Sequence, residues 1–132
     1  MSVVVGYVAT PEGTAALDTA VAEATARAVP LVVILSERGH RFGGDTADLQ
    51  SQVEDVQNRL ASTGLIYDVR QTTKGRDVAE DIITAAQSSS AELIVIGLRR
   101  RSPVGKLLLG SNAQRILLDA PCPVLAVKPQ AD

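Results

Sequence analysis

Aromatic residues are scarce in this chain of 132 residues: they make up 2% of it, and tryptophan is absent. A core without large rings must be built from aliphatic side chains. Proteins that bind nucleic acid commonly stack bases on aromatic side chains, but Tyr7, Phe42 and Tyr67 are spread through the chain and form no such platform. The formal net charge of −2 adds no general attraction for phosphates. We therefore expect no nucleic-acid partner.

Cysteine and histidine occur once each, as Cys122 and His40. One cysteine cannot form an internal disulfide, and this pair without matching spacing cannot supply the nitrogen and sulfur ligands of a metal site. His40 lies in a glycine-rich stretch and is more simply a solvent-exposed side chain than a general base. Cys122 lies between two prolines and is more simply a small buried apolar residue. We expect no resident metal and no catalytic residues.

Long apolar runs are also missing, since no stretch approaches the roughly 20 residues of a membrane span. The N-terminal residues show no signal pattern. This predicts a cytoplasmic protein without a membrane partner. The length fits one domain, residues 1–132, with 45% hydrophobic residues to form its core.

What the chain does have is a regular alternation of short β-branched runs with longer stretches of helical periodicity. This alternation is typical of an α/β fold, and it predicts an open five-stranded parallel sheet of order 3-2-1-4-5 with helices on both faces, Rossmann-like in its connections. Most of the runs are continuously apolar, which predicts strands that are buried on both faces. The expected strands are Val3–Val8, Leu31–Leu35, Ile66–Gln71, Leu93–Ile96 and Val124–Val127.

Capping residues place the helices between these strands. Thr10 followed by Pro11 predicts the start of a first helix that runs to about Ala28. A second helix is expected over about residues 45–62, from its apolar spacing. Asp77 and Ser111 are each followed three residues later by Glu or Gln, and these capping boxes predict the starts of the third and fourth helices.

Function is expected at the carboxyl edge of such a sheet, where strand order reverses and helix N-termini favour anions. The longest loop there, Gly97 to Ser111, opens with a glycine that permits close approach of a ligand. It closes with Gly110-Ser111, which would offer N–H groups and a hydroxyl to phosphate oxygens. The same residues also fit a simpler interpretation, in which Gly97 makes a turn, Gly110 ends a short helical stretch and Ser111 caps the next helix.

The chain as a whole resembles the universal stress protein family. That family has a motif of glycine, two residues, glycine, nine residues, glycine and then serine or threonine, which Gly97, Gly110 and Ser111 match in spacing. The segment Ala120–Val124 matches the Ala-Pro-Cys-Pro-Val that leads into the family's last strand, and Gly75–Ala79 resembles the lead into its third helix. The resemblance implies a five-stranded parallel sheet, frequent homodimers and, in one subset of members, bound ATP.

Two positions depart from the pattern of the ATP-binding members. Arg100 stands at the second motif glycine, where it could obstruct the phosphates or grip them with its guanidinium. Val8 stands where the family commonly has an aspartate that contacts the nucleotide. Loss of one such charged hydrogen bond costs about 1.5 to 3 kcal/mol, which weakens binding by roughly one to two orders of magnitude without forbidding it.

The favoured interpretation is a regulatory module of the stress response that binds an adenine nucleotide, ATP or AMP, with Mg²⁺ accompanying ATP. The alternatives are a nucleotide-free dimer that acts on an unknown protein partner, and a weak ATPase. The expected homodimer forms through the strand Val124–Val127, an apolar edge. The candidate nucleotide-binding residues are Val8, Ala9, Thr10, Ser36, Gly97, Arg99, Arg100, Gly110, Ser111 and Asn112.

Overall fold

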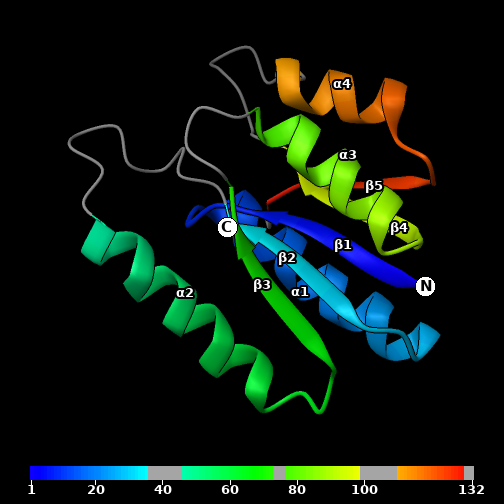
Figure 1. The fold of residues 1–132 in the computed structure, drawn as a ribbon. Coiled ribbons are helices and arrows are strands. Elements are labelled where there is room, and N and C mark those ends of the chain that lie inside the picture. Colours follow the sequence, from blue (N-terminus) through cyan, green and yellow to red (C-terminus); the bar gives the residue numbers. More distant parts are fainter. Residues whose placement is uncertain (36–45, 73–76, 99–109, 130–132) are drawn as a thin grey trace.

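The computed structural model describes residues 1–35, 46–72, 77–98 and 110–129, and within residues 46–49 it describes the backbone only. Its elements in chain order are β1 (Ser2–Tyr7), α1 (Pro11–Arg27), β2 (Leu31–Leu35), α2 (Thr46–Ala61), β3 (Tyr67–Gln71), α3 (Val78–Ser88), β4 (Ala91–Gly97), α4 (Ser111–Asp119) and β5 (Val124–Val127). They form one sheet of order β3-β2-β1-β4-β5 in which all neighbouring strands are parallel (Figure 1). The predicted fold class and strand order are confirmed.

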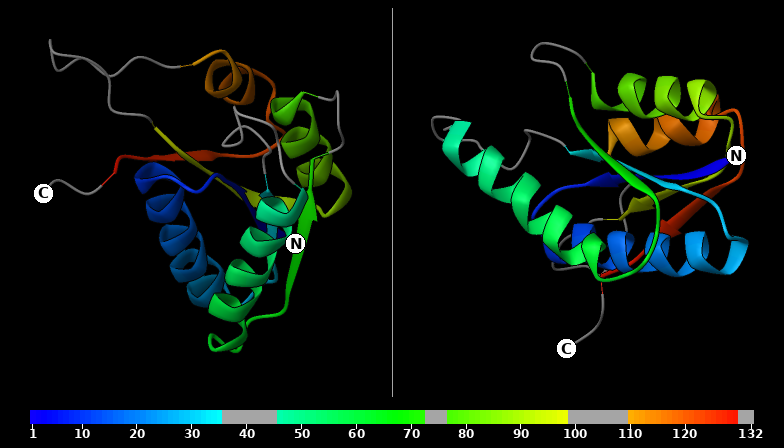
Figure 2. Two further views of the ribbon diagram at one scale, coloured as in Figure 1. Left: turned by 90° about the vertical axis from the view of Figure 1, so that its left-hand side faces the viewer. Right: turned by 60° about the horizontal axis from the view of Figure 1, so that its bottom comes forward.

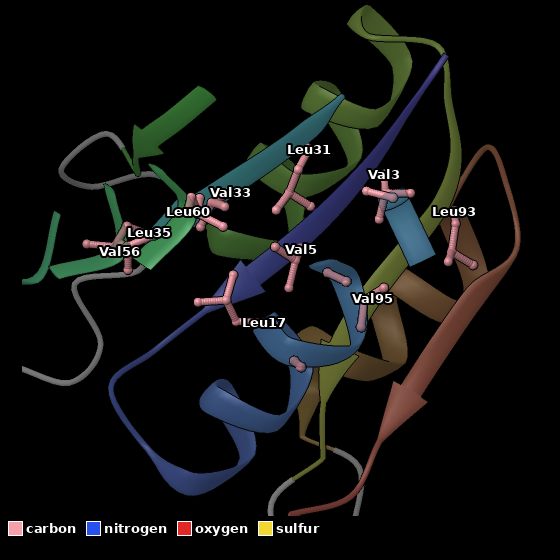
Figure 3. Close-up of a cluster of buried hydrophobic side chains, with 13 residues drawn as sticks. Val3, Val5, Leu17, Leu31, Val33, Leu35, Val56, Leu60, Leu93 and Val95 are labelled. Atoms are coloured by element: carbon pink, nitrogen blue, oxygen red, sulfur yellow. The ribbon is translucent and has the colours of Figure 1, made fainter. Parts of the chain in front are cut away.

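Helices cover both faces of the sheet, with α1 and α2 on one face and α3 and α4 side by side on the other (Figure 2). Successive residues of β1 serve the two layers alternately: Val3 and Val5 pack with α1, whereas Val4 packs with α3. Figure 3 shows the first of these cores, in which Leu17 of α1 and Leu60 of α2 lie against the valines of the sheet. The core is aliphatic, as the scarcity of aromatic residues required.

The prediction that the continuously apolar strands are buried on both faces holds for the three central strands and is wrong for β5. All five residues of β2 are buried, whereas β3, which is not a continuous apolar run, exposes Asp68, Arg70 and Gln71. In β5, Leu125 and Ala126 are exposed. The reason is topological, because an edge strand is covered by fewer neighbours, and the alternation of β3 suits one buried face.

Helix boundaries lie within a residue or so of the predicted ones, with one correction in capping. The hydroxyl of Thr10 accepts the Gly13 N–H at 3.1 Å, and the carboxylate of Asp77 accepts the Ala79 N–H at 3.1 Å, so both predicted N-caps are confirmed. In α4, however, Gly110 is the N-cap and Ser111 is already helical. The prediction that Ser111 caps this helix is therefore wrong.

Among the described residues, no helix combines the length and the apolar character that a membrane span needs.

Candidate functional site

A hollow of about 130 Å³ opens at the carboxyl ends of β1 and β4. These two strands are neighbours in the sheet, but the chain first runs from β1 to β2 and β3 on one side and then returns to β4 on the other. The hollow therefore lies at the point where strand order reverses, which is the usual ligand position in an open α/β sheet. Its lining residues are Gly6, Tyr7, Val8, Glu12, Gly13, Val78, Ile82, Ile96, Gly97, Asn112, Ala113 and Ile116.

The walls of the hollow are mainly aliphatic. Val8 comes from the end of β1, Val78 and Ile82 from the first turns of α3, and Ile116 from α4. Among the described residues that line it, Glu12 is the one with an ionisable carboxyl group. The described residues hold no group of three or more His, Cys, Asp or Glu side chains that could bind a metal ion. The hollow thus suits an uncharged part of a ligand, with polar contacts left to its rim.

Three helices, α1, α3 and α4, begin at this rim, and their starts differ. The Thr10 hydroxyl caps the start of α1, and the Asp77 carboxylate caps the start of α3. At the start of α4, Gly110 has no side chain and makes no cap bond, while its carbonyl oxygen accepts the Gln114 N–H at 3.0 Å. The N–H groups of a helix's first turn have no carbonyl partner within the helix, and the helix dipole favours an anion there. The start of α4 is accordingly the best suited of the three to receive an anionic group.

The motif glycines Gly97 and Gly110 have different physical reasons to be glycine. A Cβ placed on Gly97 would lie 2.4 Å from the Glu12 carbonyl oxygen, so this position must be glycine for the first turn of α1 to pack against the end of β4. The sequence suggested a turn or the close approach of a ligand at Gly97, and neither is needed to explain the glycine. Gly110 has φ −69°, which any residue adopts, and a Cβ there would meet no described residue within 4 Å.

The candidate residues that the sequence predicted fall into three groups. Val8, Gly97 and Asn112 line the hollow together. Ala9 and Thr10 lie in the connection from β1 to α1, where the Thr10 hydroxyl is engaged in capping α1, and Gly110 and Ser111 lie just before Asn112 at the start of α4. The remaining three, Ser36, Arg99 and Arg100, lie outside the described residues.

Sequence reasoning missed two further glycines of the hollow and the walls that α3 contributes. A Cβ on Gly13 would lie 1.9 Å from the Val8 carbonyl oxygen, and one on Gly6 would lie 2.8 Å from Cδ1 of Ile82. A glycine inside the apolar run of β1 was the available signal, because such a glycine often marks a close approach of another element. The element that approaches, α3, could not be identified from the strand itself.

Comparisons with known proteins agree with this architecture. The model of the universal stress protein family matches residues 1–128. A universal stress protein from Mycolicibacterium smegmatis is 46% identical over 127 residues, which cover 96% of this chain and 97% of that protein. A universal stress protein structure from Archaeoglobus fulgidus is 30% identical with a TM-score of 0.77, covering 97% of this chain and 98% of that one. Another from Archaeoglobus fulgidus, solved in complex with dAMP, is 26% identical with a TM-score of 0.72 and the same coverage.

Proposed function

Because this chain belongs to the universal stress protein family, we propose that it is a cytoplasmic regulatory module that binds an adenine nucleotide, ATP or AMP. The observation that carries the proposal is the hollow between the ends of β1 and β4, with the start of α4 at its rim. The dAMP complex of a relative that is 26% identical supports the ligand class.

In the proposed complex the phosphates lie against the first turn of α4, near Gly110 and Ser111, and an uncharged part of the nucleotide enters the hollow beside Val8. About 130 Å³ is less than the roughly 300 Å³ at the lower end of typical small-molecule sites, so the hollow accommodates one part of the nucleotide rather than the whole. Arg99 and Arg100, which the sequence places one residue beyond the end of β4, would add positive charge for the phosphates. Where ATP is the ligand, Mg²⁺ would accompany its phosphates.

The first test is mass spectrometry of any small molecule released from freshly purified protein, followed by titration calorimetry with AMP, ADP and ATP. We expect an adenine nucleotide to be retained or bound. Comparing wild type with Arg100→Gly at two salt concentrations separates the two possible effects of this side chain. Weaker binding with a flatter salt dependence indicates that the guanidinium holds phosphate, whereas tighter binding indicates an obstruction. If neither protein binds any of the three nucleotides, the proposal fails. Repeated ATP turnovers above those of a Gly110 variant would add a weak ATPase activity.

A second function, protein contact through a homodimer, is favoured by the position of β5. This strand is at the edge of the sheet, with β4 as its neighbour on one side, and Leu125 is 37% exposed. An uncovered apolar edge offers unpaired backbone groups to another strand. We propose that two copies pair their β5 strands antiparallel across a two-fold axis and present a surface to a protein partner. Equilibrium sedimentation that gives a single species of monomer mass at micromolar concentration would contradict this.

A further inference from the structure

Arg115 of α4 connects two of the helices whose first turns wall the hollow, α3 and α4. Its guanidinium Nη1 donates a hydrogen bond of 2.8 Å to Oδ2 of Asp77, the residue directly before α3. The same side chain lies 3.9 Å from a Glu80 oxygen in the first turn of α3 and 3.8 Å from an Asp119 oxygen of its own helix. Figures 1 and 2 show α3 and α4 running side by side over the sheet, so this bridge crosses directly between them.

Asp77 uses its two carboxylate oxygens for two different helices. Oδ1 accepts the Ala79 N–H at 3.1 Å and caps α3, while Oδ2 accepts from Arg115 of α4. The residue after Asp77 is Val78, which lines the hollow. On α4, Asn112 and Ile116 line the hollow on either side of Arg115 in sequence, but Arg115 itself is not among the lining residues that the structure describes. The bridge therefore holds the walls from outside the hollow.

We propose that Arg115 is a positioning residue for the nucleotide site, acting through Asp77 to fix the distance between the starts of α3 and α4. This inference rests on the proposed nucleotide binding. A hollow whose walls are already held in place loses less conformational entropy when a ligand enters, so fixing them increases affinity without any contact with the ligand. An exposed ion pair contributes modestly, and we therefore expect a two- to fivefold effect on the dissociation constant.

The chain offers a matched control on the opposite layer. Arg59 of α2 forms an ion pair with Asp18 of α1, which likewise joins two neighbouring helices. Its exposure is also similar, because the side chains of Arg59 and Arg115 are 45% and 42% exposed. Neither Arg59 nor Asp18 lines the hollow. Removing either arginine's charge should thus change stability to a similar small extent, and only the change at Arg115 should reach the site.

The experiment compares wild type, Arg115→Gln, Asp77→Asn, the double variant and Arg59→Gln by titration calorimetry with AMP and with ATP. Asparagine at position 77 keeps an oxygen that can cap α3 but loses the charge. We expect Arg115→Gln and Asp77→Asn each to weaken both nucleotides by the same two- to fivefold, and the double variant to be no weaker than either. Arg115→Lys should restore part of the affinity, and Arg59→Gln should bind as wild type does.

Two results overturn the inference. A loss in Arg115→Gln that is much larger for ATP than for AMP, with Asp77→Asn unaffected, would mean that Arg115 touches the phosphates directly. Equal losses in Arg115→Gln and Arg59→Gln would mean a general loss of stability. If wild type binds neither nucleotide, the proposed function fails, and hydrogen exchange still tests the bridge. The Asp81 N–H donates to the Asp77 carbonyl oxygen at 3.0 Å, and the Gln114 N–H donates to that of Gly110 at 3.0 Å, so these amides report on the first turns of α3 and α4. Arg115→Gln should then speed exchange at both amides, and Arg59→Gln should not; unchanged exchange refutes the bridge as well.

Discussion

The motif glycines Gly97 and Gly110 should respond differently to the same substitution. In Gly97→Ala the new Cβ would lie 2.4 Å from the Glu12 carbonyl oxygen, and because real Cβ atoms do not approach within 3.0 Å, α1 or β4 must shift by about half an ångström. Overpacking of this kind costs about 1 to 3 kcal/mol, partly offset by the lower entropy of alanine in the unfolded chain. We expect a net loss of about 1 to 2 kcal/mol, which lowers the Tm of a domain of this size by roughly 3 to 10 °C.

In Gly110→Ala the side chain has room among the residues that the structure describes, since none of them lies within 4 Å of the new Cβ, and φ of −69° needs no change. Alanine is a poorer N-cap than glycine, and the cost to stability should stay below about 1 kcal/mol. The methyl group would nevertheless stand in front of the first turn of α4, where we propose that phosphates bind. We expect nucleotide affinity to fall by about tenfold or more, and Gly110→Val to fall further.

Urea unfolding followed by circular dichroism measures the stability of both variants, and titration calorimetry with AMP measures their binding. If Gly97→Ala is as stable as wild type, this glycine does not serve the packing of α1. If Gly110→Ala binds AMP as wild type does, the phosphates do not lie at the start of α4. We expect Gly97→Ala to lose stability and Gly110→Ala to lose affinity for AMP. A general effect of replacing glycine by alanine would change the same property in both variants, so it cannot produce this pair of results.

Three further predictions concern stability, assembly and reactivity. Ala28 ends α1 with φ 56° and ψ 46°, a left-handed conformation that favours glycine, so Ala28→Gly should raise the free energy of unfolding by about 0.5 to 1 kcal/mol in urea titrations. Leu125→Lys would place like charges on two paired β5 strands, and sedimentation should show a shift from dimer toward monomer; an unchanged dimer would place the interface elsewhere. Burial raises the pKa of the Cys122 thiol, so the folded protein at pH 8 should react with iodoacetamide more slowly than urea-unfolded protein, and the difference should narrow as pH rises.

The sequence predicted most reliably those features that depend on neighbours in the chain. The bounds of β2 and β5 were predicted to the residue, and Thr10 and Asp77 cap their helices as expected, because an N-cap is decided by residues two or three positions away. β3 is not one of the continuous apolar runs for which two buried faces were predicted, and its alternation of Tyr67, Asp68, Val69 and Arg70 is typical of a strand with one buried face. The burial of β5 was predicted wrongly, because an apolar run does not show that its strand lies at the edge of the sheet.

Features that depend on residues far apart in the chain were predicted less well. The carboxyl ends of the strands indicated the correct edge of the sheet, and Val8, Gly97 and Asn112 do line one hollow there. The contribution of Val78 and Ile82 was missed. Whether the side chains of a helix reach the hollow depends on the distance between the helix and the sheet, and the sequence does not give that distance. Ser36, Arg99 and Arg100 lie outside the described residues, so their part in the site stays a prediction.

The glycines show why a motif is a weaker guide to chemistry than the packing around it. Gly6 gives room to Ile82 of α3, Gly13 to the carbonyl group of Val8, and Gly97 to the first turn of α1, so all three set how closely the helices approach the carboxyl edge of the sheet. None of the three therefore needs a ligand to explain it. Gly110 differs, because neither its backbone conformation nor any neighbour among the described residues requires a glycine there. The described part of the chain thus gives no packing reason for the missing side chain, and open space in front of a helix start is what an incoming phosphate would need.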